Sequence, residues 1–99
     1  MVPRLVRAVL LFASAMPSVE AAPPTPPPGA ASCSGCHATS KSVDTPVPRL
    51  VGRSPAEIEA PMQEFRTGQK PASVMDRIAK GFSDDELAAI AAWYAAQKD

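Results

Sequence analysis

The clearest hydrophobic periodicity lies near the C-terminal end of the chain. Four apolar positions at helical spacing form one face there: Leu87, Ile90, Ala91 and Tyr94. Trp93 lies beside this stripe. Ser83 precedes the run and Glu86 follows three residues later, which is the spacing of a capping box. We therefore predict a last helix that begins after Ser83 and buries the stripe.

A second amphipathic run occupies the middle of the chain. Its apolar face consists of Ile58, Met62 and Phe65. The N-cap, the first helical residue and the stop are supplied in turn by Ser54, Pro55 and Gly68. These residue types favour those positions, so a helix running to about Thr67 is predicted. Pro61 lies inside this helix and lacks an N–H, and it is expected to kink the helix or to split off its first turn.

Shorter elements fill the rest of the domain. A short helix is predicted over residues 74–80, ended by Gly81, and another over residues 33–40. Residues 41–53 and 68–73 are expected to form loops, because proline and glycine interrupt them. The sequence has no strand pattern and no repeat. The predicted fold class is therefore all-α, with three to four short helices.

The N-terminal end has the layout of a secretory signal peptide. Arg4 and Arg7 precede an apolar run at residues 8–15, and Val19-Glu20-Ala21 follows, with small or apolar side chains at the two positions that cleavage reads. Such a run is too short to span a bilayer, which takes roughly 20 apolar residues. We expect export and cleavage after Ala21. Cleavage after Ala15 and an uncleaved N-terminal anchor are the alternatives.

This layout divides the chain into three segments. Residues 1–21 are the predicted signal peptide, 22–29 a proline-rich flexible arm and 30–99 the folded domain. The arm includes Pro-Pro-Thr-Pro-Pro-Pro at 23–28, which favours an extended polyproline-like conformation. It is interpreted as a tether, with a docking ligand for a partner as the alternative.

Composition and charge narrow the possible functions. The chain has 99 residues, with 10 Lys and Arg against 10 Asp and Glu. The basic residues are scattered and form no stripe, so nucleic acid is not an expected partner. Much of the apolar content of the small domain is alanine, and domains of this size often need a disulfide, a metal or another staple.

The most specific motif is Cys33-Ser34-Gly35-Cys36-His37. The spacing Cys-x-x-Cys-His is typical of covalent haem attachment. Residues three apart on a helical turn face the same way, so the thiols of Cys33 and Cys36 can both reach the vinyl groups of one haem edge. A structural zinc site needs four ligands, whereas the chain has two Cys and one His. One covalently bound haem c per chain is therefore predicted.

His37 is the only histidine, so it is the only imidazole available to the haem iron. Histidine ligands commonly donate their other ring N–H to a carbonyl or carboxylate. The backbone carbonyl of Pro48 is the predicted acceptor, and that of Pro46 is the alternative.

Methionine is the expected sixth ligand in an electron-transfer cytochrome, because a thioether raises the reduction potential. Met75 follows a proline-containing loop, where its side chain can be aimed at the iron. Met62 shares the apolar face of the middle helix and is interpreted as a core residue. Met75 is therefore the predicted ligand, and Met62 the less favoured alternative. An open sixth position would instead indicate a haem sensor or an enzyme.

These features together resemble the class I c-type cytochromes. The resemblance covers residues 30–97 and rests on Cys33 to His37, Pro48-x-Leu50-x-Gly52, Met75 and a C-terminal helix with Trp93-Tyr94. It implies a small helical fold around one covalently bound haem, in which the first and last helices cross. It also implies that an aromatic residue of the last helix, here Trp93, packs at the crossing beside the haem.

Residues 65–83 are also similar to the haem subunit of flavocytochrome c sulfide dehydrogenases and to related dihaem cytochromes. This resemblance implies a periplasmic carrier that takes single electrons from a sulfide-oxidising flavoprotein and breaks no bonds itself. It supports Met75 as the sixth ligand, because the flanking residues match as well. A freely diffusing carrier that serves another dehydrogenase or an oxidase is the alternative.

Overall fold

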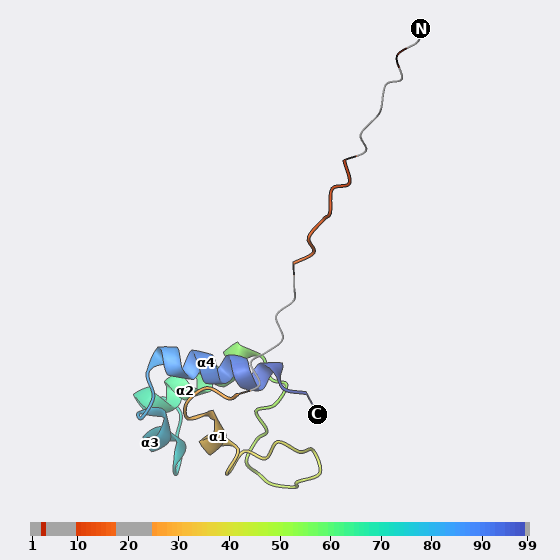
Figure 1. Ribbon diagram of the computed structural model, residues 1–99. Coiled ribbons are helices and arrows are strands. Elements are labelled where there is room, and N and C mark those ends of the chain that lie inside the picture. The colour runs from red at the N-terminus through yellow and green to blue at the C-terminus, as the bar shows by residue number, and fades with distance from the viewer. Residues whose placement is uncertain (1–2, 4–9, 18–24, 99) are drawn as a thin grey trace.

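Figure 1 shows the computed structural model of the protein, which describes residue 3, residues 10–17 and residues 25–98. Four helices occur in this part of the chain: α1 Ala30–Cys33, α2 Pro55–Thr67, α3 Met75–Ala79 and α4 Asp84–Ala96. The same residues contain no strand, so the predicted all-α class is confirmed for them. No helix there is long and apolar enough to cross a membrane.

Helix α2 begins and ends where the sequence predicts. The Ser54 hydroxyl accepts a hydrogen bond from the Glu57 N–H at 3.3 Å. Gly68 ends the helix in the left-handed region, with φ of 80°, a conformation that glycine adopts without strain. The helix is continuous through Pro61, so the expected separation of its first turn was wrong. Tertiary packing explains the difference, because Ile58 in the preceding turn belongs to the buried core.

Helix α4 has the predicted cap and the predicted buried face. The Ser83 hydroxyl accepts from the Glu86 N–H at 3.2 Å, and the Glu86 carboxylate accepts from the Ser83 N–H at 3.0 Å. These two bonds complete the capping box and lower the pKa of the Glu86 carboxyl. The residues of α4 that are buried are Leu87, Ile90, Ala91 and Tyr94.

Helix α1 is the element that sequence reasoning placed wrongly. A helix was expected over residues 33–40, whereas α1 ends at Cys33 and turns follow. Gly35 costs about 1 kcal/mol relative to alanine in a helix, and its N–H makes a tighter three-residue bond to the Ser32 carbonyl at 3.3 Å. One helical bond persists, from the His37 N–H to the Cys33 carbonyl at 2.9 Å.

The core is small and joins three of the helices. Its buried cluster consists of Ala30, Ile58, Ile90, Ala91 and Tyr94. The Tyr94 hydroxyl donates to the Ala30 carbonyl, which ties α4 to α1. Helix α3 (within the predicted 74–80 span) packs against α2 at one end of the domain, and α4 lies along α2 (Figure 1). The core thus links the cysteine-bearing end of the chain to its last helix.

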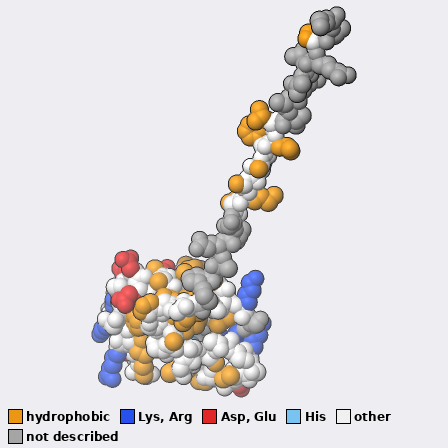
Figure 2. All heavy atoms as spheres, in the orientation of Figure 1, with side chains coloured by type: hydrophobic (Ala, Val, Ile, Leu, Met, Phe, Trp, Pro, Cys, Tyr) orange, Lys and Arg blue, Asp and Glu red, His pale blue; other side chains and the backbone are white. Residues whose placement is uncertain are grey.

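The segment before the domain is described only in part. Residues 10–17 have no regular structure, and their apolar side chains are exposed, Phe12 to 91%; they are orange in Figure 2. The predicted cleavage point at Ala21 and residues 22–24 of the arm lie outside the described residues. On the face drawn in Figure 2, basic side chains are spread over both edges of the domain and form no single stripe.

Candidate haem site

The two cysteines of the motif lie in different surroundings. Cys33 is half-buried and packs against the core cluster, whereas Cys36 is exposed in the turn that follows α1. The Cys33 Sγ lies 3.8 Å from the Gly29 carbonyl oxygen. Burial raises the pKa of the Cys33 thiol. The Cys33 thiol thus lies against the core, and the Cys36 thiol lies at the surface.

His37 makes the hydrogen bond that the sequence predicts. Its Nδ1 lies 2.6 Å from the Pro48 carbonyl oxygen. A carbonyl oxygen can only accept, so Nδ1 is the donor, and Nε2 is the ring nitrogen left for a metal ion. This arrangement fixes the orientation of the ring, as carbonyl and carboxylate acceptors do for metal-bound histidines. The chain therefore presents one imidazole nitrogen that is suited to binding iron.

Bonds from side chains to the backbone hold the segment that contains Pro48. The Arg49 Nη2 donates to the Thr39 carbonyl at 2.8 Å, and the Arg53 Nε donates to the Arg49 carbonyl at 2.6 Å. At the end of the segment, the Gly52 N–H donates to the Tyr94 carbonyl at 3.1 Å. The bonds from Arg49 to Thr39 and from Gly52 to Tyr94 join residues ten or more positions apart, so no local pattern predicted them.

The two candidate methionines occupy different positions. Met75 is the first residue of α3 and follows the 68–74 segment, whereas Met62 lies in the interior of α2. Both are half-buried. Two large apolar side chains near Met75 in the sequence are exposed: Val74, the N-cap residue of α3, to 55% and Ile78, within α3, to 40%.

Trp93 is the aromatic residue that the family resemblance places beside the haem. It is half-buried and packs against the cluster that joins α1 and α4. Trp93 and Lys98 also line a surface cavity of about 680 Å³, together with Ser34 and Thr39. Neither cysteine, nor His37 or Met75, lines this cavity. Among the predicted haem-binding residues, Trp93 therefore lines the cavity, whereas the two cysteines and the predicted iron ligands do not.

The residues present fit a covalently attached haem. Two thiols three residues apart follow the end of a helix, and the next side chain is an imidazole that is already oriented by the Pro48 carbonyl. Leu50 and Val51 lie close by and pack with Cys33 against the core. Sulfur anchors, one free imidazole nitrogen and apolar neighbours are the groups that an apolar, iron-containing ring requires.

Comparison with known proteins adds two relatives. No protein-family model matches the chain. The chain is 36% identical over 63 residues to the "Cytochrome subunit of sulfide dehydrogenase" of Chlorobaculum tepidum, a match that covers 64% of this chain and 57% of that protein. It is also 36% identical over 70 residues to the "Cytochrome c-554(548)" of Halomonas halodenitrificans, covering 67% of this chain and 84% of that protein.

Proposed function

The chain belongs to the c-type cytochromes and carries covalently bound haem c, and on this basis we propose that it is a periplasmic monohaem carrier that accepts single electrons from a sulfide-oxidising flavoprotein. The observation that carries the electron-transfer proposal is the bond from His37 Nδ1 to the Pro48 carbonyl at 2.6 Å. It presents one imidazole nitrogen, in a fixed orientation, directly after the second haem-attaching cysteine.

In this proposal each residue of the site has a separate task. Cys33 and Cys36 form the two thioether bonds, and His37 supplies the nitrogen ligand. Bound haem supplies a one-electron iron couple, whose potential depends on the axial ligands, hydrogen bonding and burial. The Pro48 carbonyl holds the His37 ring, and Trp93 packs at the contact between α1 and α4.

Met75 is the proposed sixth ligand. It stands at the start of a five-residue helix after an irregular segment, where a side chain can approach the iron without distorting a longer helix. Met62 lies inside α2, on the same helix face as the buried Ile58. A methionine on the iron leaves no open coordination position, which favours electron transfer over a sensor or an oxygen-activating enzyme.

The ligand assignment is tested by the optical spectrum of the oxidised protein. Ferric haem ligated by methionine sulfur has a weak far-red charge-transfer band. Met75→Ala should abolish this band, while Met62→Ala should keep it. If the band survives Met75→Ala and disappears in Met62→Ala, the assignment is wrong. If the wild-type protein is high-spin and has no such band, the sixth position is open and the carrier proposal fails.

The proposed partner rests on the name of one relative. The Chlorobaculum tepidum protein is the cytochrome subunit of a sulfide dehydrogenase, and this chain spans little more than half of that protein's length. Transfer of electrons from a flavoprotein is tested by mixing the two purified proteins with sulfide and following haem reduction. A cytochrome that neither copurifies with the flavoprotein nor is reduced in this mixture excludes the partner.

A freely diffusing carrier is the second candidate. The observation that favours it is the match to cytochrome c-554(548), of which the chain covers 84%. The two candidates use the same site residues, so only association separates them. A free carrier should elute as a monomer from an extract that also contains its reductase.

A further inference from the structure

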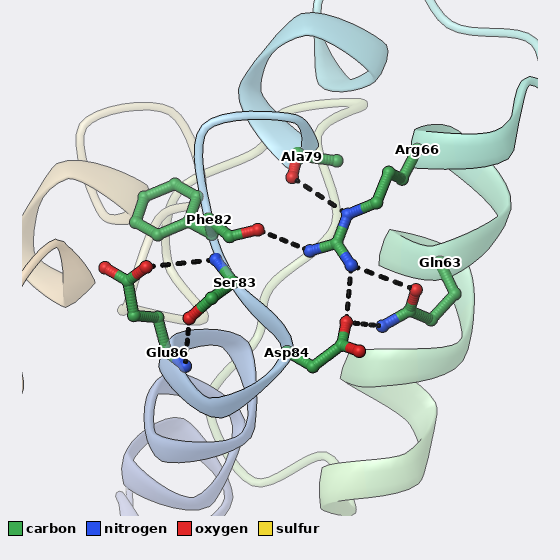
Figure 3. A network of polar contacts seen from close by, with 7 residues as sticks. All are labelled: Gln63, Arg66, Ala79, Phe82, Ser83, Asp84 and Glu86. Atoms are coloured by element: carbon green, nitrogen blue, oxygen red, sulfur yellow. Dashed lines mark hydrogen bonds and ion pairs between the residues drawn. The ribbon is translucent and has the colours of Figure 1, made fainter.

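The side chain of Arg66 lies where three elements meet (Figure 3). It projects from the last turn of α2 towards the end of α3 and the start of α4. Its Nε donates to the Ala79 carbonyl at 3.4 Å and its Nη2 to the Phe82 carbonyl at 2.5 Å. The remaining nitrogen, Nη1, pairs with the Asp84 carboxylate. One guanidinium group thus connects α2 to both sides of the turn between α3 and α4.

The two carbonyls lie at the end of α3 and in the turn that follows it. Ala79 is the last residue of α3 and is fully buried, and the last carbonyls of a helix lack intrahelical donors. The Ala79 carbonyl also accepts from the Phe82 N–H of the turn at 3.4 Å. A planar guanidinium with several fixed N–H groups can donate to two carbonyls at once, so Arg66 adds a donor to each of them.

Helix α3 needs such support because of its length. It has five residues, and isolated helices shorter than about 12 residues are marginal in water. Its N-cap residue, Val74, provides no side-chain cap bond. The helix therefore depends on its packing against α2 and on the bonds from Arg66 for a fixed position.

The contact with Asp84 orients the guanidinium group. Gln63 donates to Asp84 Oδ1 at 2.8 Å and accepts from Arg66 Nη1 at 3.2 Å. Asp84 is 77% exposed and Arg66 25% exposed. An ion pair with one exposed partner contributes little by itself, so the bonds to the two carbonyls are the consequential part of the network.

The turn held by Arg66 also contacts the cysteine side of the domain. The Phe82 ring lies against Gly29, so that a Cβ added at Gly29 would fall 2.5 Å from Phe82 Cε1. Gly29 is the N-cap of α1, and Cys33 is the last residue of that helix. The backbone of Phe82 is thus bonded to α2, while its side chain packs on α1.

We propose that Arg66 is a positioning residue for Met75, because it fixes the end of α3 and the following turn against α2 and thereby sets the methionine side of the haem site relative to Cys33. The inference rests on the proposed ligation of the iron by Met75. Arg66 itself does not touch the haem in this proposal. Its loss should let α3 move away while the rest of the domain stays folded.

The test is a titration of the oxidised holoprotein with imidazole. Imidazole binds the iron only when the methionine has left, so its apparent affinity reports the population of molecules with Met75 displaced. Arg66→Met removes every donor and keeps an apolar stem. It should raise the apparent imidazole affinity at least about tenfold, the factor that corresponds to the loss of one bond to a charged donor.

Matched variants separate positioning from general stability. Arg77→Met removes an exposed arginine from α3 itself and should leave imidazole affinity within twofold of wild type. Arg66→Lys keeps the charge but cannot reach both carbonyls in the same way, so its affinity should lie between those of the wild type and Arg66→Met. In urea unfolding followed by circular dichroism, the unfolding equilibrium constant of Arg66→Met should change by a smaller factor than its imidazole affinity does.

Each outcome decides a separate point. Unchanged imidazole affinity in Arg66→Met, or an equal rise in Arg77→Met, overturns the positioning role. If Arg66→Met fails to fold, Arg66→Lys gives the decision, and failure of both to fold also overturns the role, because Arg66 would then support the whole domain. Met75→Ala is the independent check: if it leaves imidazole affinity unchanged, the ligand assignment fails, whatever the result at Arg66.

Discussion

The two halves of the domain are ordered by different kinds of interaction. From residue 54 onward, α2 and α4 have helical periodicity, serine caps and buried faces that meet each other. From residue 34 to 53 the described chain forms no helix. Its shape depends on bonds between residues far apart in sequence, such as His37 to Pro48 and Arg49 to Thr39.

This difference indicates where the haem contributes most to the fold. Helices with caps and apolar stripes have local reasons to form. A loop that is held by a few side-chain bonds has a large conformational entropy to overcome. Because Cys33, Cys36 and His37 lie at the start of that loop, the covalently bound ring should supply the missing order there. The comparison can be tested by removing the ring, the loop contacts or the helix contacts in turn.

Removal of both thiols should have the largest effect. In the double variant Cys33→Ala and Cys36→Ala the haem is not attached, and the domain loses a large apolar group. We expect no cooperative unfolding transition, because small domains without a disulfide, a metal or a bound cofactor are only marginally stable. Thermal and urea unfolding followed by circular dichroism measure this. A haem-free variant that unfolds cooperatively as a compact monomer would contradict the interpretation.

The same difference explains which parts of the fold were predictable. The bounds of α2 and the buried residues of α4 follow from apolar spacing and from capping residues, which act locally. The expected helix over residues 33–40 was wrong, because Gly35 and tertiary bonds replace helical bonds after Cys33. The continuity of α2 through Pro61 was missed for a related reason, since the burial of Ile58 is a tertiary effect.

The candidate site was predictable to a different extent. Cys33, Cys36 and His37 form a contiguous motif, so the sequence alone identifies them. The contact of His37 with Pro48 was predicted from what metal-bound histidines require, and the structure contains it. The network around Arg66 was not predicted, because it joins backbone carbonyls to a side chain 13 and 16 residues away. Every residue has a backbone carbonyl, so the sequence does not indicate which carbonyls accept bonds from a side chain.

Substitution of Gly29 tests the contact between Phe82 in the helical half and the N-cap of α1, which precedes the loop. Gly29 has φ of 86°, and an added Cβ would overlap Phe82 Cε1 at 2.5 Å. Gly29→Ala should therefore combine backbone strain of about 1–2 kcal/mol with overpacking of about 1–3 kcal/mol. The free energy of unfolding in urea measures the sum.

Gly52→Ala is the matched control for this substitution. Gly52 has φ of 77°, and nothing lies within 4 Å of an added Cβ. Only the backbone strain of about 1–2 kcal/mol applies there. If the two variants lose equal stability, the contact between Phe82 and Gly29 contributes nothing to the stability of the domain.

The smallest expected effect is a pH dependence in the helical half. Hydrogen bonds from Gln63 and Arg66, together with the charge of Arg66, hold the pKa of the Asp84 carboxyl below its ordinary value. Because the pKa is lowered in the folded state, Asp84 contributes fully to the free energy of unfolding at pH values above the pKa of an unfolded aspartate. This contribution is lost as the pH falls through the pKa of the folded state. Because Asp84 is exposed, the effect should be modest.

Asp84→Asn and Asp85→Asn form the matched pair for this measurement. Both remove one carboxylate from the first turn of α4, so they change the helix-end electrostatics to a similar degree. Only Asp84→Asn removes the partner of Arg66. The urea midpoint should fall between neutral pH and pH about 3, and this fall should be smaller in Asp84→Asn than in Asp85→Asn. Equal slopes in the two variants would mean that the Arg66 network adds no pH-dependent stability, and that the carbonyl bonds alone hold the turn to α2.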